Sequence, residues 1–258
     1  MWTTICGGSL RFAHFGTELG NVHPRDGQAA ARILGALEGL GETSGVLMQP
    51  EFTHRLCTSD AVEPWRDGLW RTTLECDGLH LEPGDRPVMI ANGDCSVGVL
   101  TEGQRAVVMH LGLDCLVRTD GGPTVLEQAV AALGGPARAM RFFAGGAIGA
   151  CCHGYSHETD AERRRLAALS ARFGADVVRG TVARGPRRGA VAYDHRGIAV
   201  RLARQLGVEW IEEDTRCTAC AGLGEPDAAG YGAFYSHTRD HLGGRERNLA
   251  VVAWAPGV

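Results

Sequence analysis

Three short apolar runs between Val88 and His110 constrain the fold more than any other part of the chain. Each is bounded by Gly, Asp or other polar residues, as buried strands are; they are Val88–Ala91, Val97–Leu100 and Ala106–Met109. Asp94 and Cys95 follow the first run, and His110 follows the third. Strand ends of this kind hold metal ligands, or a nucleophile and its base, on rigid supports. The structural alternative is a packed thiol and a hydrogen-bonded core histidine, because free cysteine is among the most buried residue types.

Helical and strand patterns alternate along the rest of the chain. Helices are expected over Asp26–Leu40, Thr124–Leu133, Glu158–Arg172 and His195–Leu206, the last capped by Asp194. Further strands are expected over Val46–Gln49, Arg138–Ala144, Val208–Glu212 and Leu249–Trp254, and residues 57–71 read as an exposed loop. This order predicts an α/β or α+β fold, with residues 1–258 forming a single domain in which helices flank a mixed central sheet.

Charge and hydropathy exclude several classes of protein. The net charge of −4 is spread over mixed signs, whereas a nucleic-acid-binding face needs clustered basic residues. No run of 18 apolar residues is present, so a transmembrane helix is not expected. The first residues lack the features of a signal peptide, which favours a cytoplasmic protein. We therefore expect a small-molecule substrate and neither nucleic acid nor membrane as partner, and the oligomeric state stays open.

The cysteine content favours metal binding, catalysis or buried thiols over disulfides. Nine cysteines occur in a chain without a recognisable secretion signal, and the odd number does not fit complete pairing. Cys217 and Cys220 have C-x-x-C spacing, but no second such pair follows them, so a structural role is the simpler interpretation. The adjacent Cys151 and Cys152 are interpreted as packed thiols.

Several separated segments carry motifs that occur together in one known protein family. They are Cys76-Asp77-Gly78, Glu82-Pro83-Gly84, Gly93-Asp94-Cys95-Ser96-Val97, the stretch from His110 to Cys115, the stretch from Gly145 to Cys152, Cys217-Thr218, and the stretch from Phe234 to Arg245. In this order they resemble the YfiH family, also described as the laccase-domain, purine nucleoside phosphorylase or peptidoglycan-editing family. The resemblance implies the fold of that family. It also implies action on purine nucleosides, by phosphorolysis or deamination, or hydrolysis of an amide in peptidoglycan precursors.

The resemblance further implies a zinc ion held by two His and one Cys, with an open position for water or substrate. Cys95 and His110 match two of these ligands, the first as thiolate and the second as neutral imidazole. Three protein ligands and an open position are the arrangement of a catalytic zinc, which lowers the pKa of bound water or polarises a reacting oxygen.

The third ligand is ambiguous in this sequence. The family motif Gln-Val-His-Gly corresponds to Gln49-Pro50-Glu51-Phe52, which puts Glu51 in the ligand position. His54 takes that position only with a shift of three residues, but it restores two His and one Cys, and we favour it for that reason. Carboxylate and imidazole are both usual zinc ligands. A histidine in a surface loop is the structural alternative for His54.

Other positions depart from the family pattern around the expected site. The Trp-Arg pair after the ligand His is Leu113-Asp114 here, so a cation is replaced by an anion that would repel phosphate. Hydrolysis with Asp114 or Asp94 as general base therefore fits better than phosphorolysis, although Asp114 would also suit a helix N-terminus. The residues expected to contact substrate are Glu18, which replaces a family Asn, together with Gln49, Arg239 and Arg245.

Together these features predict a divergent zinc-dependent enzyme with an altered small-molecule substrate and hydrolytic or lyase-like chemistry. The rival hypothesis is a non-catalytic member of the family that binds a ligand or partner after losing part of its metal site. The two differ in metal content, because only the enzyme needs stoichiometric zinc with an open coordination position.

Overall fold

The computed structural model describes residues 1–118, 120–155, 158–174, 177–184, 187–222, 233–236 and 246–257. The strands, in chain order, are β1 (Thr3–Ile5), β2 (Leu10–Phe15), β3 (Val46–Met48), β4 (Leu56–Cys57), β5 (Val62–Pro64), β6 (Trp70–Thr72), β7 (Gly78–Leu81), β8 (Val88–Asn92), β9 (Ser96–Thr101), β10 (Ala106–Leu111), β11 (Arg141–Ala144), β12 (Gly154–Tyr155), β13 (Val178–Thr181), β14 (Val191–Tyr193), β15 (Trp210–Glu213) and β16 (Asn248–Trp254). The α-helices are α1 (Ala29–Gly39), α2 (Leu113–Leu116), α3 (Val125–Leu133), α4 (Asp160–Phe173) and α5 (His195–Gln205).

Most strands belong to two mixed sheets. A seven-stranded sheet has the order β1-β2-β16-β8-β3-β6-β5, and a six-stranded sheet has the order β15-β11-β9-β10-β7-β4. A third, three-stranded sheet has the order β12-β14-β13. The mixed α/β fold predicted from the sequence is confirmed, with the difference that the strands divide between two large sheets instead of one central sheet.

The two large sheets pack face to face. In β10, Ala106 and Val108 belong to the core cluster between the sheets, whereas Val107 and Met109 belong to the cluster under the helices. This alternation follows from the two-residue period of a strand. Because both faces are buried, the strand reads in sequence as a continuous apolar run rather than an alternating one.

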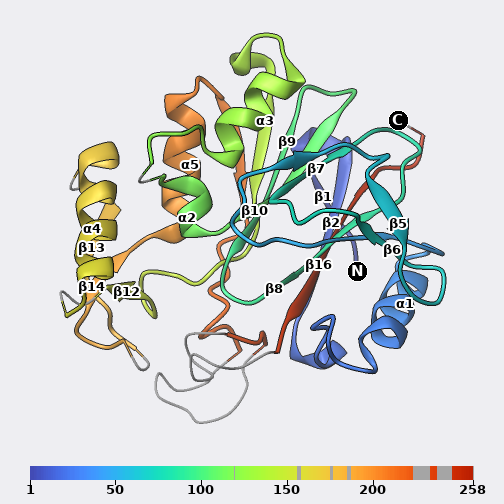
Figure 1. The fold of residues 1–258 in the computed structure, drawn as a ribbon, viewed down its shortest axis with the longest axis horizontal. Helices are drawn as coiled ribbons and strands as arrows, with labels where there is room; N and C mark the ends of the chain where they lie inside the picture. The colour runs from blue at the N-terminus through green and yellow to red at the C-terminus, as the bar shows by residue number, and fades with distance from the viewer. Residues whose placement is uncertain are drawn as a thin grey trace.

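Helices cover the outer faces of this sandwich. Helix α1 packs on the seven-stranded sheet through Ile33 and Leu37, while α2, α3 and α5 lie beyond the six-stranded sheet (Figure 1). Helix α4 lies beside the small sheet at the edge of the molecule (Figure 1). The layers therefore run helix, sheet, sheet, helix. Among the described residues, none of the helices has the length and hydropathy of a bilayer-spanning segment.

Several of the elements predicted from the sequence are found in the structure. The three runs that opened the sequence analysis are β8, β9 and β10, and the cap at Asp194 is confirmed, since its side chain accepts a hydrogen bond from the Gly197 amide. The expectation of an exposed loop over residues 57–71 is wrong in part. This segment contains β5 and most of β6, and Leu69 is fully buried.

Candidate functional site

The turn between β8 and β9 carries the chain from one large sheet to the other. Strand β8 ends at Asn92 in the seven-stranded sheet, and β9 begins at Ser96 in the six-stranded sheet, so the turn between them contains Asp94 and Cys95. The Asn92 side-chain amide donates to the carbonyl of Cys95 over 2.9 Å, which fixes the turn. Cys95 is thereby held at the end of the gap between the sheets, and its side chain is partly exposed.

His110 lies near the end of β10 and is oriented by Asp77, which precedes β7. The two strands are antiparallel neighbours, and the His110 amide donates to the Asp77 carbonyl over 2.9 Å. The carboxylate Oδ1 of Asp77 also lies 3.0 Å from His110 Nδ1. Both side chains are buried, with Asp77 at 0% and His110 at 5% exposure. Since Nδ1 is engaged by the carboxylate, Nε2 is the nitrogen available to a metal.

The same carboxylate organises the loop that contains the candidate third ligands. Its oxygens accept hydrogen bonds from the amides of Phe52 and His54 and from the Thr53 hydroxyl. Phe52 and His54 have φ angles of 55° and 58°, a region that non-glycine residues rarely occupy. Such conformations persist only where surrounding contacts impose them, and they concentrate at functional sites.

The protonation of this group follows from its neighbours. Burial lowers the pKa of His110, but the electrostatic interaction with Cys95 and the hydrogen bond with Asp77 outweigh that effect, so the pKa lies well above 6.5. Burial raises the pKa of Asp77, yet the hydrogen bond with His110 and the loop amides bring it below its ordinary value. Both shifts favour the charged forms of the pair. Because a metal binds the imidazole in its neutral form, metal affinity falls as pH falls.

Cys95 and His110 line one large cavity of about 790 Å³. Its walls combine charged, aromatic and apolar side chains. They are His23, Pro24, Arg25, Met48, Gln49, Pro50, Glu51, Phe52, Glu75, Ala91, Asn92, Gly93, Asp94, Cys95, His110, Leu113, Asp114, Ile148, His153, Tyr155, Arg165, Arg187, Tyr193, His195 and Arg247. A concave site with converging polar groups of this kind is the usual setting for a small-molecule ligand.

The two candidates for the third ligand lie in different surroundings. Glu51 is part of the cavity wall, next to Phe52, whose ring centroid lies 5.1 Å from that of His110. His54 is not part of that wall, and its carbonyl accepts a hydrogen bond from Gln128 on α3. The described residues hold no group in which Cys95, His110 and either His54 or Glu51 all lie within 4.8 Å of one another. The choice of His54 over Glu51 therefore stays a prediction.

His110 also belongs to a group of three residues whose donor atoms lie close together. Asp77, His110 and Cys115 have donor atoms within 4.8 Å of one another, and all three residues are buried. Asp77 Oδ1 and Cys115 Sγ both approach the same nitrogen, Nδ1, at 3.0 and 3.9 Å. Burial raises the pKa of Cys115 to about 11. These contacts fit an outer shell that orients the imidazole better than a set of metal ligands.

Asp114 lies in the cavity wall but is not an isolated anion. Its Oδ2 lies 2.8 Å from Nη2 of Arg165 on α4. Arg165, which comes from another helix, offsets the negative charge of Asp114 and so reduces the repulsion of phosphate that was expected from the sequence. The interpretation of Asp114 as a free general base is weakened for the same reason.

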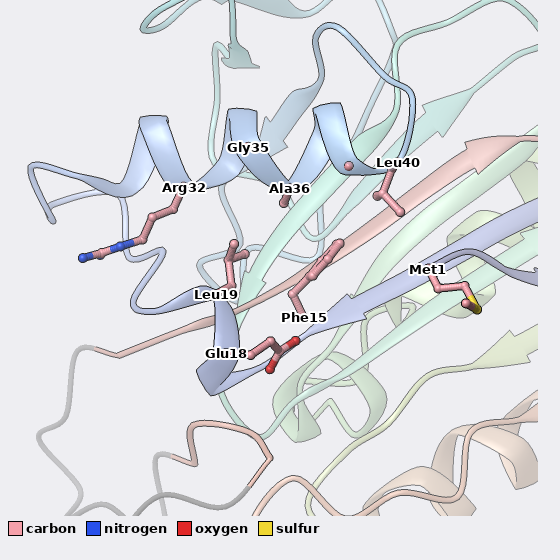
Figure 2. A pocket seen from close by; sticks show the side chains of 9 residues that line it. Met1, Phe15, Glu18, Leu19, Arg32, Gly35, Ala36 and Leu40 are labelled. Carbon is pink, nitrogen blue, oxygen red and sulfur yellow. The ribbon is translucent and has the colours of Figure 1, made fainter.

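The remaining predicted site residues lie in different places. Gln49 belongs to the cavity wall, but its amide nitrogen donates to the Thr72 carbonyl over 2.7 Å. Glu18 belongs to another cavity, between the start of the chain and α1, and accepts a hydrogen bond from the Gly16 amide (Figure 2). Arg239 and Arg245 lie outside the described residues.

Sequence reasoning missed several residues that shape the site. In the sequence Asp77 stands out only as part of the motif Cys76-Asp77-Gly78, and its contact with His110 depends on the pairing of β7 with β10. Tyr155 and Tyr193 have ring centroids 5.0 Å apart and are stacked, and His195 Nε2 lies 2.8 Å from the Leu111 carbonyl. The prediction of a cap at Asp194 was the only signal near His195. The tyrosines gave none, because the small sheet that carries them was not predicted.

Comparison with known proteins establishes the fold. No protein-family model matches the sequence, and no curated protein matches it. Among solved structures, YlmD from Geobacillus stearothermophilus has a TM-score of 0.69 and 18% identity, covering 98% of this chain and 96% of the other. A Neisseria meningitidis protein of the DUF152 family has a TM-score of 0.65 and 17% identity, with 98% and 97% covered. The hypothetical protein YfiH of Bacillus licheniformis has a TM-score of 0.62 and 15% identity, with 95% and 92% covered. The resemblance to the YfiH family is thus confirmed for the fold over nearly the whole chain.

Proposed function

We propose that this protein is a zinc-dependent enzyme that hydrolyses a small polar substrate in the cavity around Cys95 and His110. The observation that carries the proposal is the buried contact between Asp77 and His110 Nδ1, 3.0 Å long, beside the Cys95 thiol. Carboxylate–histidine pairs of this kind hold metal-ligating imidazoles in one tautomer and one orientation.

The donor set suits zinc. Thiolate, imidazole and carboxylate are its usual protein ligands, and Cys95, His110 and Glu51 provide one of each on the wall of a single cavity. We choose Glu51 over His54 as third ligand because Glu51 shares that wall. When bound, zinc supplies a water molecule of lowered pKa or a Lewis acid beside the substrate.

The protein's own side chains then determine what binds and where a proton can go. We assign Asp94 as the general base, because it adjoins Cys95 in the turn, lines the cavity and has its Oδ1 held by the Thr218 hydroxyl over 2.9 Å. Arg165 and Arg187 line the cavity as ion pairs with Asp114 and Glu162, and their guanidinium N–H groups can donate to an anionic group. Phe52, Tyr155 and Tyr193 provide an aromatic wall for a planar ring.

Purine nucleosides combine such a planar ring with polar hydroxyl groups, and they are the substrate class that the family resemblance implies. The test is to incubate the purified zinc-loaded protein with adenosine, inosine and guanosine, with and without inorganic phosphate, and to separate the products by chromatography. Deamination of adenosine gives inosine and ammonia, whereas phosphorolysis gives the free base and a ribose phosphate and requires phosphate. We expect the phosphate-independent product.

Variants distinguish the metal site from the rest of the fold. Cys95→Ser and His110→Ala should each remove the zinc ion of the cavity, which lowers the zinc content by about one ion per chain, and should abolish turnover. Asp77→Asn should weaken zinc binding by about 10–100-fold, as loss of an outer-shell partner does. Cys57→Ala, in the core away from the cavity, is the matched control and should retain both the bound zinc and the turnover.

Full zinc occupancy in Cys95→Ser and His110→Ala would contradict the assignment of the site. Zinc binding without turnover of any nucleoside would contradict the proposed substrate class.

A further inference from the structure

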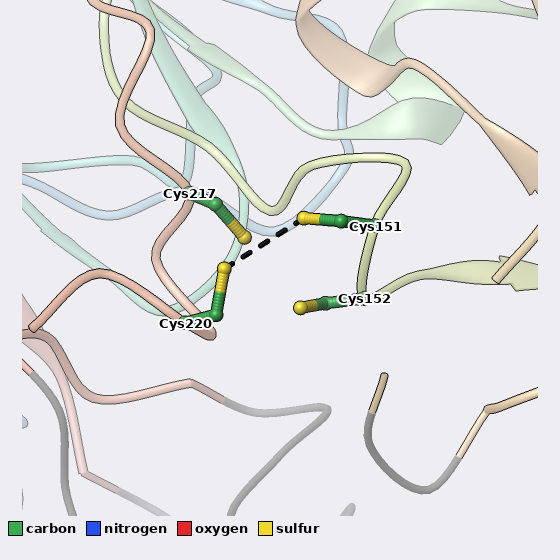
Figure 3. Close-up of side chains that lie close together, drawn as sticks. All are labelled: Cys151, Cys152, Cys217 and Cys220. Atoms are coloured by element: carbon green, nitrogen blue, oxygen red, sulfur yellow. Dashed lines mark hydrogen bonds between the residues drawn. The ribbon is translucent and has the colours of Figure 1, made fainter. Parts of the chain in front are cut away.

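Four cysteine sulfur atoms gather at one point outside the cavity wall (Figure 3). The Sγ atoms of Cys151, Cys152, Cys217 and Cys220 all lie within 4.8 Å of one another. Cys151 and Cys152 follow β11, whereas Cys217 and Cys220 follow β15. Because β11 and β15 are parallel neighbours, the segments that follow them leave the sheet at the same edge, and this brings the two pairs of cysteines together. The sequence gives no sign of this convergence, since 69 residues separate Cys151 from Cys220.

The spacing of the sulfur atoms matches a mononuclear metal site. A Zn–S bond of about 2.3 Å puts neighbouring sulfurs of a tetrahedron about 3.8 Å apart, and Cys151 Sγ lies 3.7 Å from Cys220 Sγ. A disulfide would need about 2.05 Å between these atoms. Iron–sulfur clusters with several irons bind their thiolates to different metals, which spreads the sulfurs further than this group allows.

The surrounding backbone contacts the sulfur atoms closely. The Gly149 amide donates to Cys217 Sγ over 3.2 Å. A Cβ atom at Gly149 would lie 3.2 Å from Cys151 Sγ and 3.5 Å from Cys217 Sγ, so a larger residue would press on Cys151 and leave less room around the sulfurs. Four sulfur atoms gathered in this way are the donors that a soft divalent cation prefers.

We propose that Cys151, Cys152, Cys217 and Cys220 bind a zinc ion in a closed, tetrahedral, structural site that is separate from the cavity around Cys95 and His110. Four thiolates leave no open position for water or substrate, which distinguishes a structural zinc from a catalytic one.

The contacts around the cluster indicate what this zinc would hold in place. Ala147 forms an isolated parallel bridge with Cys217, so the two cysteine-bearing segments already meet there. Each segment also contacts the turn before β9: the Ile148 amide donates to the Asp94 carbonyl and the Thr218 hydroxyl donates to the Asp94 carboxylate, both over 2.9 Å. A zinc ion joining the segments would therefore fix the position of the Asp94 carboxylate in the cavity.

The decisive experiment removes the cavity ligands first. In the Cys95→Ser/His110→Ala double variant of the full chain, any zinc retained after purification belongs to the four cysteines. We expect about one zinc per chain, with X-ray absorption showing four sulfur neighbours at about 2.3 Å. Replacement of zinc by cobalt should give the intense thiolate-to-cobalt charge-transfer absorption of a four-sulfur site.

Substitutions at Cys220 then test the ligand set in the same background. Cys220→Ala should lose the zinc, whereas Cys220→His should retain it, because three Cys and one His also form a usual structural site. Cys57→Ala is the control and should keep full occupancy, and circular dichroism checks that each variant is folded. A folded double variant without zinc would overturn the proposal, as would a Cys151–Cys220 disulfide in freshly purified, metal-free protein.

Discussion

At the scale of single residues, Asp77 connects more of the candidate site than any residue singled out from the sequence. Its carboxylate meets His110 Nδ1 and also holds the loop of Phe52 and His54 in an unusual backbone conformation. Neither relation is visible in the sequence, because each depends on the register that places Gly78 opposite Met109. The positions of Cys95 and His110 could be predicted, because the ends of strands can be recognised from apolar runs in the sequence. The contacts of Asp77 that orient His110 could not be predicted in this way.

A second residue, His195, provides a prediction for the pH dependence of stability. Burial lowers its pKa from 6.5 to about 4, and the nearby charge of His110 acts in the same direction. Between these pH values the unfolded chain binds a proton that the folded chain excludes, so the free energy of unfolding falls as pH falls. The expected loss from this residue is about 2 kcal/mol between pH 7 and pH 5.

Urea unfolding of wild type and His195→Gln at both pH values measures this effect. Glutamine keeps a nitrogen that can donate to the Leu111 carbonyl but cannot titrate, so the variant should lose about 2 kcal/mol less than wild type on acidification. His23→Gln, outside the core clusters, serves as control and should follow wild type. Equal pH dependence in wild type and His195→Gln would contradict the lowered pKa, because it would show that folding leaves the pKa of His195 unchanged.

At the scale of secondary-structure elements, capping and burial explain what was predictable. Helix α3 begins with a capping box between Thr124 and Glu127, and strands β8 to β10 are buried on both faces. Strands β12 and β14 have two and three residues, which is too short for a periodic signal. The aromatic wall and the four-cysteine group depend on such short or irregular segments, and so they emerge only from the folded chain.

The ion pair between α2 and α4 gives a prediction for anion binding. Asp114→Asn should release Arg165 from its partner and raise the affinity for inorganic phosphate, whereas Arg165→Gln should lower it. Because both side chains are more than a third exposed, we expect changes of about tenfold or less that shrink with added salt.

Isothermal titration with phosphate at low and moderate salt measures these changes. Arg172→Gln is the matched control, because Arg172 lies on the same helix but pairs with Glu127 away from the cavity. Identical phosphate affinity in wild type and both variants would mean that the Asp114–Arg165 pair takes no part in anion binding.

At the scale of the whole molecule, the core between the two sheets joins distant parts of the chain. Its members range from Ile5 near the start to Trp254 near the end. A core shared in this way favours one cooperative unfolding transition. An unfolding experiment on a residue of this core can therefore test the prediction that the chain forms a single domain.

Leu79→Ala probes that shared core. Leu79 is buried between the sheets, so the substitution should lower the free energy of unfolding by about 2–5 kcal/mol while calorimetry still shows one transition. Leu74→Ala, at a side chain that is 51% exposed, should change little and serves as control. A second transition in Leu79→Ala, with one transition retained at its original midpoint, would show that the sheets unfold independently.

The position of β16 in the seven-stranded sheet has a consequence for synthesis on the ribosome. This strand lies between β2 and β8, and it pairs antiparallel with both. Until residues 248–254 have left the exit tunnel, β2 and β8 each present an open edge with unpaired amides and carbonyls. A nascent chain cannot close this sheet before residues 248–254 are available, and until then those edges are exposed to other chains. Premature termination before β16 would therefore yield a product prone to aggregation rather than a smaller folded protein.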